Sequence, residues 1–267
     1  AHRDCGEYLA QQLAKFGAKV YNQYADLEAW DGTILKARNI IGAYNPDSKK
    51  RIMLCAHWDS RPYADYDADE KNHKKPIDGA NDGASGVGVL LEIARQIQKE
   101  APTVGIDIIF FDAEDYGTPA WHRGSYKPHD WCLGSQYWGR TPHVQGYYAR
   151  YGILLDMVGG KGGTFYYEPY SYRTARKEVK KIWEKAHELG YGSYFVKQEG
   201  SEVTDDHVYV NQLARIPCVD IINYDPVYEN SSFGPTWHTV NDNISNIDRN
   251  TLKAVGQTVM DVIYNEK

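Results

Sequence analysis

The stretch from Ile106 to Gly117, IDIIFFDAEDYG, constrains the fold more than any other part of the chain. It begins with an apolar run, which predicts a strand buried on both faces of a sheet. It then ends in three acids, Asp112, Glu114 and Asp115. Ligands of open α/β sheets bind beyond the carboxyl ends of the strands, so these acids fall where a site would form. Taken alone, an acidic turn that caps the next helix is the more common explanation.

Two other apolar segments also deliver polar side chains. The predicted buried strand Arg51–Ala56 runs directly into His57, and Asp59 follows two residues later, so that both side chains point the same way in an extended segment. An isolated His-x-Asp pair is usually a hydrogen-bonded structural pair. The predicted strand Tyr151–Val158 carries Asp156 inside it. A carboxylate in an apolar strand costs several kcal/mol unless it is paired or bound to a metal, so Asp156 needs a partner.

Helical and strand patterns alternate along the rest of the chain. Apolar residues at helical spacing predict helices over residues 7–16, 87–98, 173–189 and 247–264, and further strands over 20–27, 33–44, 166–167 and 216–223. Residues 61–78 are predicted to form a long polar loop, and residues 116–140 an irregular segment. No repeat or Pro/Gly linker divides the chain. We therefore expect one α/β domain over residues 1–267, with a mixed, largely parallel central sheet and helices on both faces.

Composition excludes several classes of function. The net charge is −6 and no basic block is present, which argues against nucleic acid as a partner, and no apolar run is long enough to span a membrane. The sequence starts with Ala1 rather than Met and shows no signal peptide. A removed export signal would fit a periplasmic or secreted protein, and a chain trimmed at its start would fit equally. The four cysteines show no paired metal spacing. The 22 Tyr and 7 Trp, many in predicted loops, suggest an aromatic pocket, although most could simply pack under loops.

Acids and histidines form a set at predicted strand ends. Asp82 belongs to it because it precedes a predicted helix within a run of small residues, where it could be an N-cap or a metal ligand. The whole set is His57, Asp82, Glu114, Asp115, Asp156 and His238. Oxygen and nitrogen ligands without a thiolate suit a catalytic zinc, which takes about three protein ligands. The surplus could hold a second zinc or form a proton-handling network.

Five motifs in this order resemble the zinc-dependent exopeptidase superfamily. They are His57-x-Asp59-Ser60, Gly79-x-x-Asp82-Gly83-x-Ser85-Gly86, Phe111-Asp112-x-Glu114-Asp115, Leu155-Asp156, and His238-Thr239 with Asp242. Together they extend over residues from about 50 to 250 and are highly specific. Two branches of the superfamily fit them, the di-zinc aminopeptidases and the glutaminyl cyclases, which use one zinc.

Three features resemble the cyclases more closely. These are the run Trp237-His238-Thr239-x-x-Asp242-Asn243, the aromatic Phe233 four residues before Trp237, and Asp205-Asp206-His207. Two positions depart from the animal cyclases, because Asp115 stands where those enzymes have Glu and Asp220 stands where they have His. The sequence therefore favours the cyclase over the aminopeptidase.

The cyclase resemblance implies a role for each site residue. One zinc would be held by Asp82, Asp115 and His238, and Glu114 would move the protons. Asp156 and Asp206 would form a shared-proton network that holds the tetrahedral intermediate, and Trp121, Phe233 and Trp237 would wall the pocket. The substrates would be peptides or proteins with an N-terminal glutamine, which is converted to pyroglutamate with release of ammonia.

The aminopeptidase resemblance implies a different use of the same residues. Asp82 would bridge two zincs, the second one being completed by His57 and Asp156, and Glu114 would activate a water. A third class is a metal-binding or carbohydrate-associated module that has lost catalysis. Glu114 argues against that class, because a structural zinc needs no base beside it.

Overall fold

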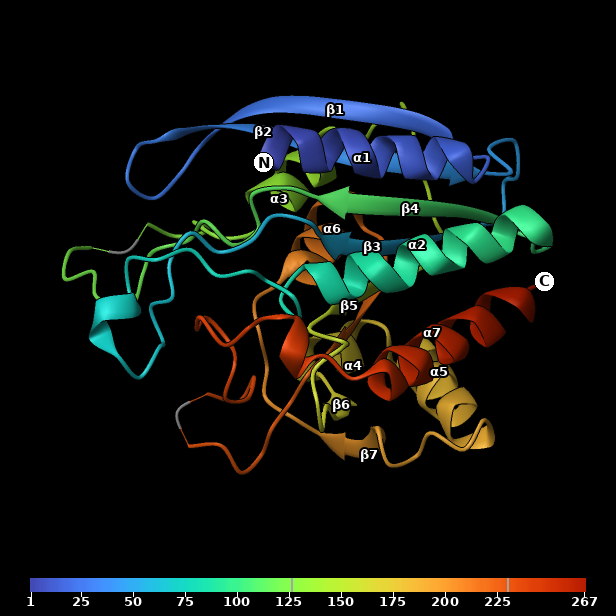
Figure 1. Cartoon of the computed structure of the whole chain (residues 1–267). Coiled ribbons are helices and arrows are strands. Elements are labelled where there is room, and N and C mark those ends of the chain that lie inside the picture. Colours follow the sequence, from blue (N-terminus) through green and yellow to red (C-terminus); the bar gives the residue numbers. More distant parts are fainter. Residues whose placement is uncertain (126, 230) are drawn as a thin grey trace.

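A six-stranded sheet forms the centre of the computed structural model, which describes residues 1–125, 127–229 and 231–267 (Figure 1). The strands are β1 (Lys19–Glu28), β2 (Ile34–Tyr44), β3 (Arg51–His57), β4 (Gly105–Phe111), β5 (Gly152–Asp156) and β8 (Cys218–Ile222). Their order is β1-β2-β4-β3-β5-β8. The last four run parallel, and β1 and β2 are added antiparallel at one edge. The predicted fold class is therefore confirmed.

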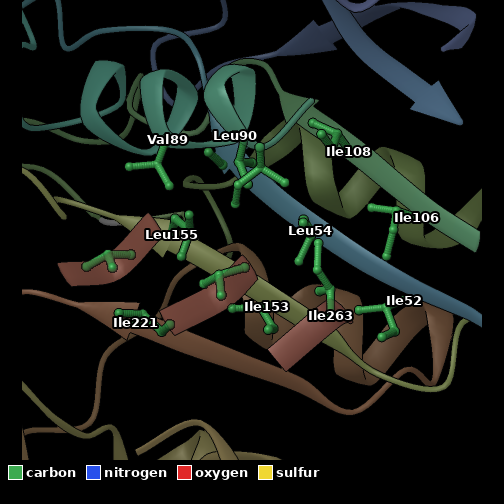
Figure 2. Packing of buried hydrophobic residues seen from close by; sticks show 14 of the residues in the cluster. Ile52, Leu54, Val89, Leu90, Ile106, Ile108, Ile153, Leu155, Ile221 and Ile263 are labelled. Carbon is green, nitrogen blue, oxygen red and sulfur yellow. The ribbon is translucent and has the colours of Figure 1, made fainter. Parts of the chain in front are cut away.

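Helices cover both faces of this sheet. On one face lie α1 (His2–Lys15), α2 (Ala84–Lys99) and α7 (Arg249–Tyr264), with α5 (Arg176–Glu188) beside α7, and on the other α3 (Leu133–Arg140) and α6 (Asp206–Ala214). Successive residues of β3 alternate between the two cores: Leu54 packs with the α2 and α7 side, and Met53 with the α3 and α6 side. Figure 2 shows Leu54 and Ile153 beside Leu90 and Ile263. Burial on both faces explains why these strands are continuously apolar.

The structure corrects several predicted elements. Residues 116–140 are not wholly irregular, because α3 closes that segment; its two glycines, Gly134 and Gly139, weaken the helical signal. The helix predicted over 173–189 is two helices, α4 (Pro169–Thr174) and α5, separated at Ala175. Two elements were not predicted: the helix α6 and the strand β7 (Phe195–Glu199), which pairs with β6 (Phe165–Tyr167). Within the described residues, no helix combines the length and apolarity needed to cross a membrane.

The parallel strands place the chemistry at one edge of the sheet. Their carboxyl ends lie toward the left of Figure 1, where the long loops gather. The loop before α2 reaches this edge through Gly83, which has a φ of 92° and lies where a Cβ would be 2.8 Å from the carbonyl oxygen of Asp59. Only glycine allows both this backbone conformation and this close approach. It delivers Asp82 to the strand ends.

Candidate metal and catalytic site

Three of the predicted ligands converge at the carboxyl edge. Asp82 precedes α2, Asp115 follows β4, and His238 lies in the loop before α7. The Nε2 atom of His238 lies 3.2 Å from Asp115 Oδ1 and 3.4 Å from Asp82 Oδ2. All three side chains are buried. The structure thus brings two carboxylates together with the nitrogen of His238, which lies more than 120 residues further along the chain.

The carboxylate oxygens of this cluster that accept no hydrogen bond are suited to bind a metal ion. Oδ2 of Asp82 and both oxygens of Asp115 accept no hydrogen bond from the part of the chain that the structure describes. Buried carboxylate oxygens without donors are costly, so they point to a bound cation. One imidazole and two carboxylates are typical zinc ligands.

His57 and Asp156 form a second cluster that shares Asp82. His57 Nε2 lies 3.0 Å from Asp82 Oδ1 and 3.2 Å from Asp156 Oδ1. Asp82 therefore stands between the two histidines, with one oxygen facing each. The cluster can hold a second metal ion, or it can be an ion pair that fixes Asp82.

Two acids that carried no predicted role hold the ligand loops. The carboxylate of Asp59 accepts hydrogen bonds from the backbone N–H groups of Glu114 and Asp115, both at 3.0 Å. Asp242 does the same for Asn81 and Asp82, at 2.7 and 3.0 Å. Each acid therefore fixes two consecutive amides. Both residues belong to the motifs read from the sequence, but spacing alone could not show that they hold backbone rather than metal.

Glu114 faces the pocket next to the cluster of Asp82, Asp115 and His238. The pocket has a volume of about 610 Å³ and includes Glu114, Asp115, Asp156 and His238 in its lining. Burial raises the pKa of Glu114 well above the ordinary value of a glutamate. A carboxylate of this kind can accept a proton and retain it near neutral pH.

Asp205, and not the predicted Asp206, is the acid that lines the pocket. Burial raises the pKa of Asp205 to about 7, and the charge of Asp156 acts in the same direction. Asp206 is the first residue of α6 and is fully buried outside the lining, beside Asp205. The two residues are neighbours at a helix start, so their side chains point in different directions. The structure thus places Asp205 on the pocket wall and Asp206 behind it, and the shared-proton role of Asp206 stays a prediction.

More buried polar groups lie behind Asp205. His207 places its Nε2 atom 3.1 Å from Glu168 Oε2 and its Nδ1 atom 3.5 Å from Asp220 Oδ2. Burial and the charge of Asp205 raise the pKa of Asp220 well above its ordinary value. Glu168 also accepts two backbone hydrogen bonds at the start of α4. The predicted interior acid Asp220 thus belongs to a network that continues the pocket wall into the core.

Aromatic rings form one wall of the pocket. Trp237 stacks on His238 with ring centroids 3.8 Å apart, and Phe233 packs against Trp237 at 4.8 Å. Trp131 lines the same pocket and lies parallel to the His238 ring at 6.0 Å. The predicted Trp121 is not brought to this pocket, because it packs against Tyr63 at the 61–78 loop. Trp121 and Trp131 both lie in the irregular segment before α3, so the sequence could not show which of them faces the pocket.

The 61–78 loop inserts Arg61 beneath this wall. Arg61 is fully buried and makes two hydrogen bonds to Asp65, of 2.8 and 2.7 Å. It also donates to the backbone carbonyl of Asp115, and its guanidinium lies 4.5 Å from the Trp131 ring centroid. Asp65 Oδ1 in turn lies 3.5 Å from His238 Nδ1. The loop therefore supports both the predicted ligands Asp115 and His238 and the aromatic wall of the pocket. It includes the short 3₁₀-helix Glu70–Asn72.

Unusual backbone conformations also gather at this edge. Ala113, Cys132, Met157 and His238 all have positive φ angles, between 48° and 57°. Such angles are uncommon for residues other than glycine and persist where surrounding contacts enforce them. They are typical of functional sites.

A larger hollow of about 870 Å³ lies elsewhere, between α2 and α7. Its acids Glu92 and Asp261 are paired with the cations Arg95 and Lys185 near the surface. It contains none of the convergent buried carboxylates and histidines. The chemistry of the chain therefore lies at the strand ends.

Comparison with known proteins agrees with this geometry. The family model described as Peptidase family M28 matches residues 39–263. The glutaminyl-peptide cyclotransferase of Bos taurus is 29% identical over 251 residues, which cover 80% of this chain and 62% of that protein. The chain thus spans about three fifths of the length of the curated cyclotransferases that it matches.

Solved structures give closer matches. The crystal structure of a Bacteroides thetaiotaomicron glutaminyl cyclase bound to N-acetylhistamine has a TM-score of 0.97 and 63% identity, covering all of this chain (100%) and 90% of that one. A leucine aminopeptidase precursor from Bacteroides thetaiotaomicron has a TM-score of 0.96 and 62% identity, with coverage of 100% and 89%. Similarity of this degree extends to proteins named for either activity.

Proposed function

The chain belongs to peptidase family M28, and from that premise we propose that it is a glutaminyl-peptide cyclotransferase. The proposed substrates are peptides and proteins with an N-terminal glutamine. The products are the pyroglutamyl peptide and ammonia. The similarity to several bacterial proteins named glutaminyl cyclase, at 49% to 63% identity, supports this proposal.

One observation carries the proposal. A proton-accepting acid, a three-residue ligand cluster and a wall of aromatic rings line one pocket, through Glu114, His238 and Trp237. The rings on the pocket wall can exclude water from the reacting atoms. Exclusion matters because attack by water on the same carbonyl would give hydrolysis instead of a ring.

The reaction needs little from the protein besides orientation and proton transfer. The α-amine of the substrate attacks its own side-chain amide carbon, so the two reacting groups are already tethered. A carbon–nitrogen bond forms, Glu114 takes a proton from the amine, and it passes that proton to the leaving nitrogen, which departs as ammonia. General acid–base help of this kind contributes about 10²–10⁴ in rate. Asp205 and Asp156, both on the pocket wall, would share a proton and stabilise the intermediate.

Asp82, Asp115 and His238 are the proposed ligands of one zinc ion per chain. When bound there, zinc supplies a Lewis acid that polarises the substrate carbonyl. The chain's own residues set the position of these ligands, through the hydrogen bonds of Asp59 and Asp242 to the ligand loops.

Aminopeptidase activity is the second candidate, and the cluster of His57, Asp82 and Asp156 is the observation that favours it. With a metal ion at each cluster, Asp82 would be the bridging ligand, and Glu114 would activate a water. The similarity to a protein named leucine aminopeptidase precursor supports the same alternative.

A pair of substrates separates the two candidates. A glutaminyl peptide should release ammonia and keep its peptide bond, while a leucyl peptide should remain intact. The metal content should be one zinc per chain. Free leucine released at a comparable rate, together with two tightly held zinc ions, would overturn the cyclase proposal and establish the aminopeptidase.

A further inference from the structure

Cys132 lies directly against the proposed base. Its Sγ atom is 3.1 Å from Glu114 Oε1, and the thiol is fully buried. Across the described residues, this thiol is the one hydrogen-bond donor that contacts the Glu114 carboxylate. The sequence alone assigned this cysteine no role, because it has no partner at metal spacing.

The backbone holds this contact in place from both sides. The N–H of Cys132 donates to the Glu114 carbonyl at 2.9 Å, and that of Leu133 donates to the Ala113 carbonyl at 3.0 Å. Ala113 and Cys132 both have positive φ angles, of 53° and 57°. These conformations cost energy and are maintained by the paired backbone. The thiol is therefore fixed relative to the end of β4.

Next to this contact lies a second carboxylate. One carboxylate oxygen each of Glu114 and Asp205 and the Sγ atom of Cys132 lie within 4.8 Å of one another. Asp205 Oδ2 is buried and accepts no hydrogen bond from any described group. Burial and the charge of Glu114 raise the pKa of the Cys132 thiol well above its ordinary value, so the thiol keeps its proton and remains a donor.

We propose that Cys132 is a positioning residue, whose S–H group donates to Glu114 Oε1 and leaves Oε2 aimed at the substrate amine. The proposal rests on the assignment of Glu114 as the base of the proposed function. The thiol serves as a hydrogen-bond donor and forms no covalent bond. Without it, the Glu114 side chain could turn toward solvent or share a proton with Asp205 in an unproductive orientation.

Three variants test this role. Cys132→Ala removes the donor and should lower kcat by about tenfold, the effect of one hydrogen bond to a charged group, while KM and zinc content stay within about twofold. Cys132→Ser retains a donor and should recover most of that loss. Cys55→Ala is the matched control, because Cys55 is also fully buried and its thiol contacts the Ile153 carbonyl and Cys218 rather than a carboxylate. This control should lower the melting temperature without lowering kcat.

A double-mutant cycle with Glu114→Gln completes the test. Once Glu114 is removed, Cys132→Ala should have no further effect on residual turnover. The S–H infrared stretching band of Cys132, assigned by its loss in Cys132→Ser, should shift to higher frequency in Glu114→Gln. That spectroscopic measurement decides the question if Cys132→Ala does not fold.

Two results would overturn the inference: an unshifted S–H band, or equal kcat in the wild type, Cys132→Ala and Cys132→Ser. Neither result touches the proposed function, which is tested separately on the wild type with the glutaminyl and leucyl peptides.

Discussion

The two ends of β4 carry buried aspartates with opposite surroundings. Asp107, toward its amino end, and Asp115, just beyond its carboxyl end, are each 1% exposed. Asp107 accepts hydrogen bonds from Arg51 at 2.5 and 2.7 Å and from the Tyr147 hydroxyl at 2.8 Å. Neither oxygen of Asp115 accepts a hydrogen bond from the described residues.

This difference separates a structural acid from a ligand. A buried carboxylate is tolerated when donors or cations compensate it, as Arg51 and Tyr147 compensate Asp107. At the other end the compensation is incomplete, although Arg61 lies 3.6 Å from Asp115. The fold thus leaves room there for a cation that the protein itself does not supply. Burial alone would not have distinguished the two residues.

Glu114→Gln should produce the largest change at the carboxyl end. The amide cannot accept the amine proton, so kcat should fall by about 10²–10⁴, while zinc content and melting temperature stay unchanged. Steady-state ammonia release and metal analysis measure both. Wild-type turnover in this variant would mean that Glu114 only caps the end of the strand.

Asp107→Asn and Asp115→Asn compare the two ends directly. Loss of the Asp107 charge leaves Arg51 buried without its counter-charge and should lower the free energy of unfolding by about 3–5 kcal/mol. Asp115→Asn removes a carboxylate that lacks donors, so the metal-free protein should be as stable as the wild type or more stable. Urea unfolding in the presence of a chelator measures both. Equal destabilisation by the two variants would contradict the comparison.

Trp237→Ala should weaken substrate binding at the carboxyl end. Burial of a large apolar side chain contributes about 1.5–3 kcal/mol, so its loss should raise KM by about tenfold or more. Zinc affinity should change little, because the ring stacks on His238 without contributing a ligand atom. Kinetics on a glutaminyl peptide and a zinc titration check the two parts. A loss of zinc with no change in KM would show that the ring only supports His238.

Trp121→Ala should have the smallest effect. Its ring packs at the 61–78 loop, away from the pocket that Trp131 lines. KM should therefore stay within about twofold of the wild type, whereas Trp131→Ala should raise it by about tenfold. Kinetics of the two variants, measured side by side, test the placement. The opposite ranking would restore Trp121 as the pocket wall.

The central sheet and the cluster of predicted ligands could both be predicted from the amino-acid sequence. Continuous apolar runs such as Ile106–Phe111 predict buried strands, and the polar residues that follow them must lie at strand ends. Because parallel strands share one carboxyl edge, Asp115 and Asp156 were expected at the same edge of the sheet, and both line the pocket there. Predicted ligands in loops, such as His238, were identified because their motifs occur in the same order as in the zinc-dependent exopeptidases. The placement of Asp82, Asp115 and His238 together agrees with that prediction.

Which of two candidate residues faces the pocket became clear from the folded chain alone. Asp205 lies on the pocket wall and Asp206 does not, and Trp131 replaces Trp121. The contact between Cys132 and Glu114 could not be predicted from the sequence either. Periodicity orients side chains within a strand or helix, but in loops and at helix starts the direction of a side chain depends on the packing of distant segments.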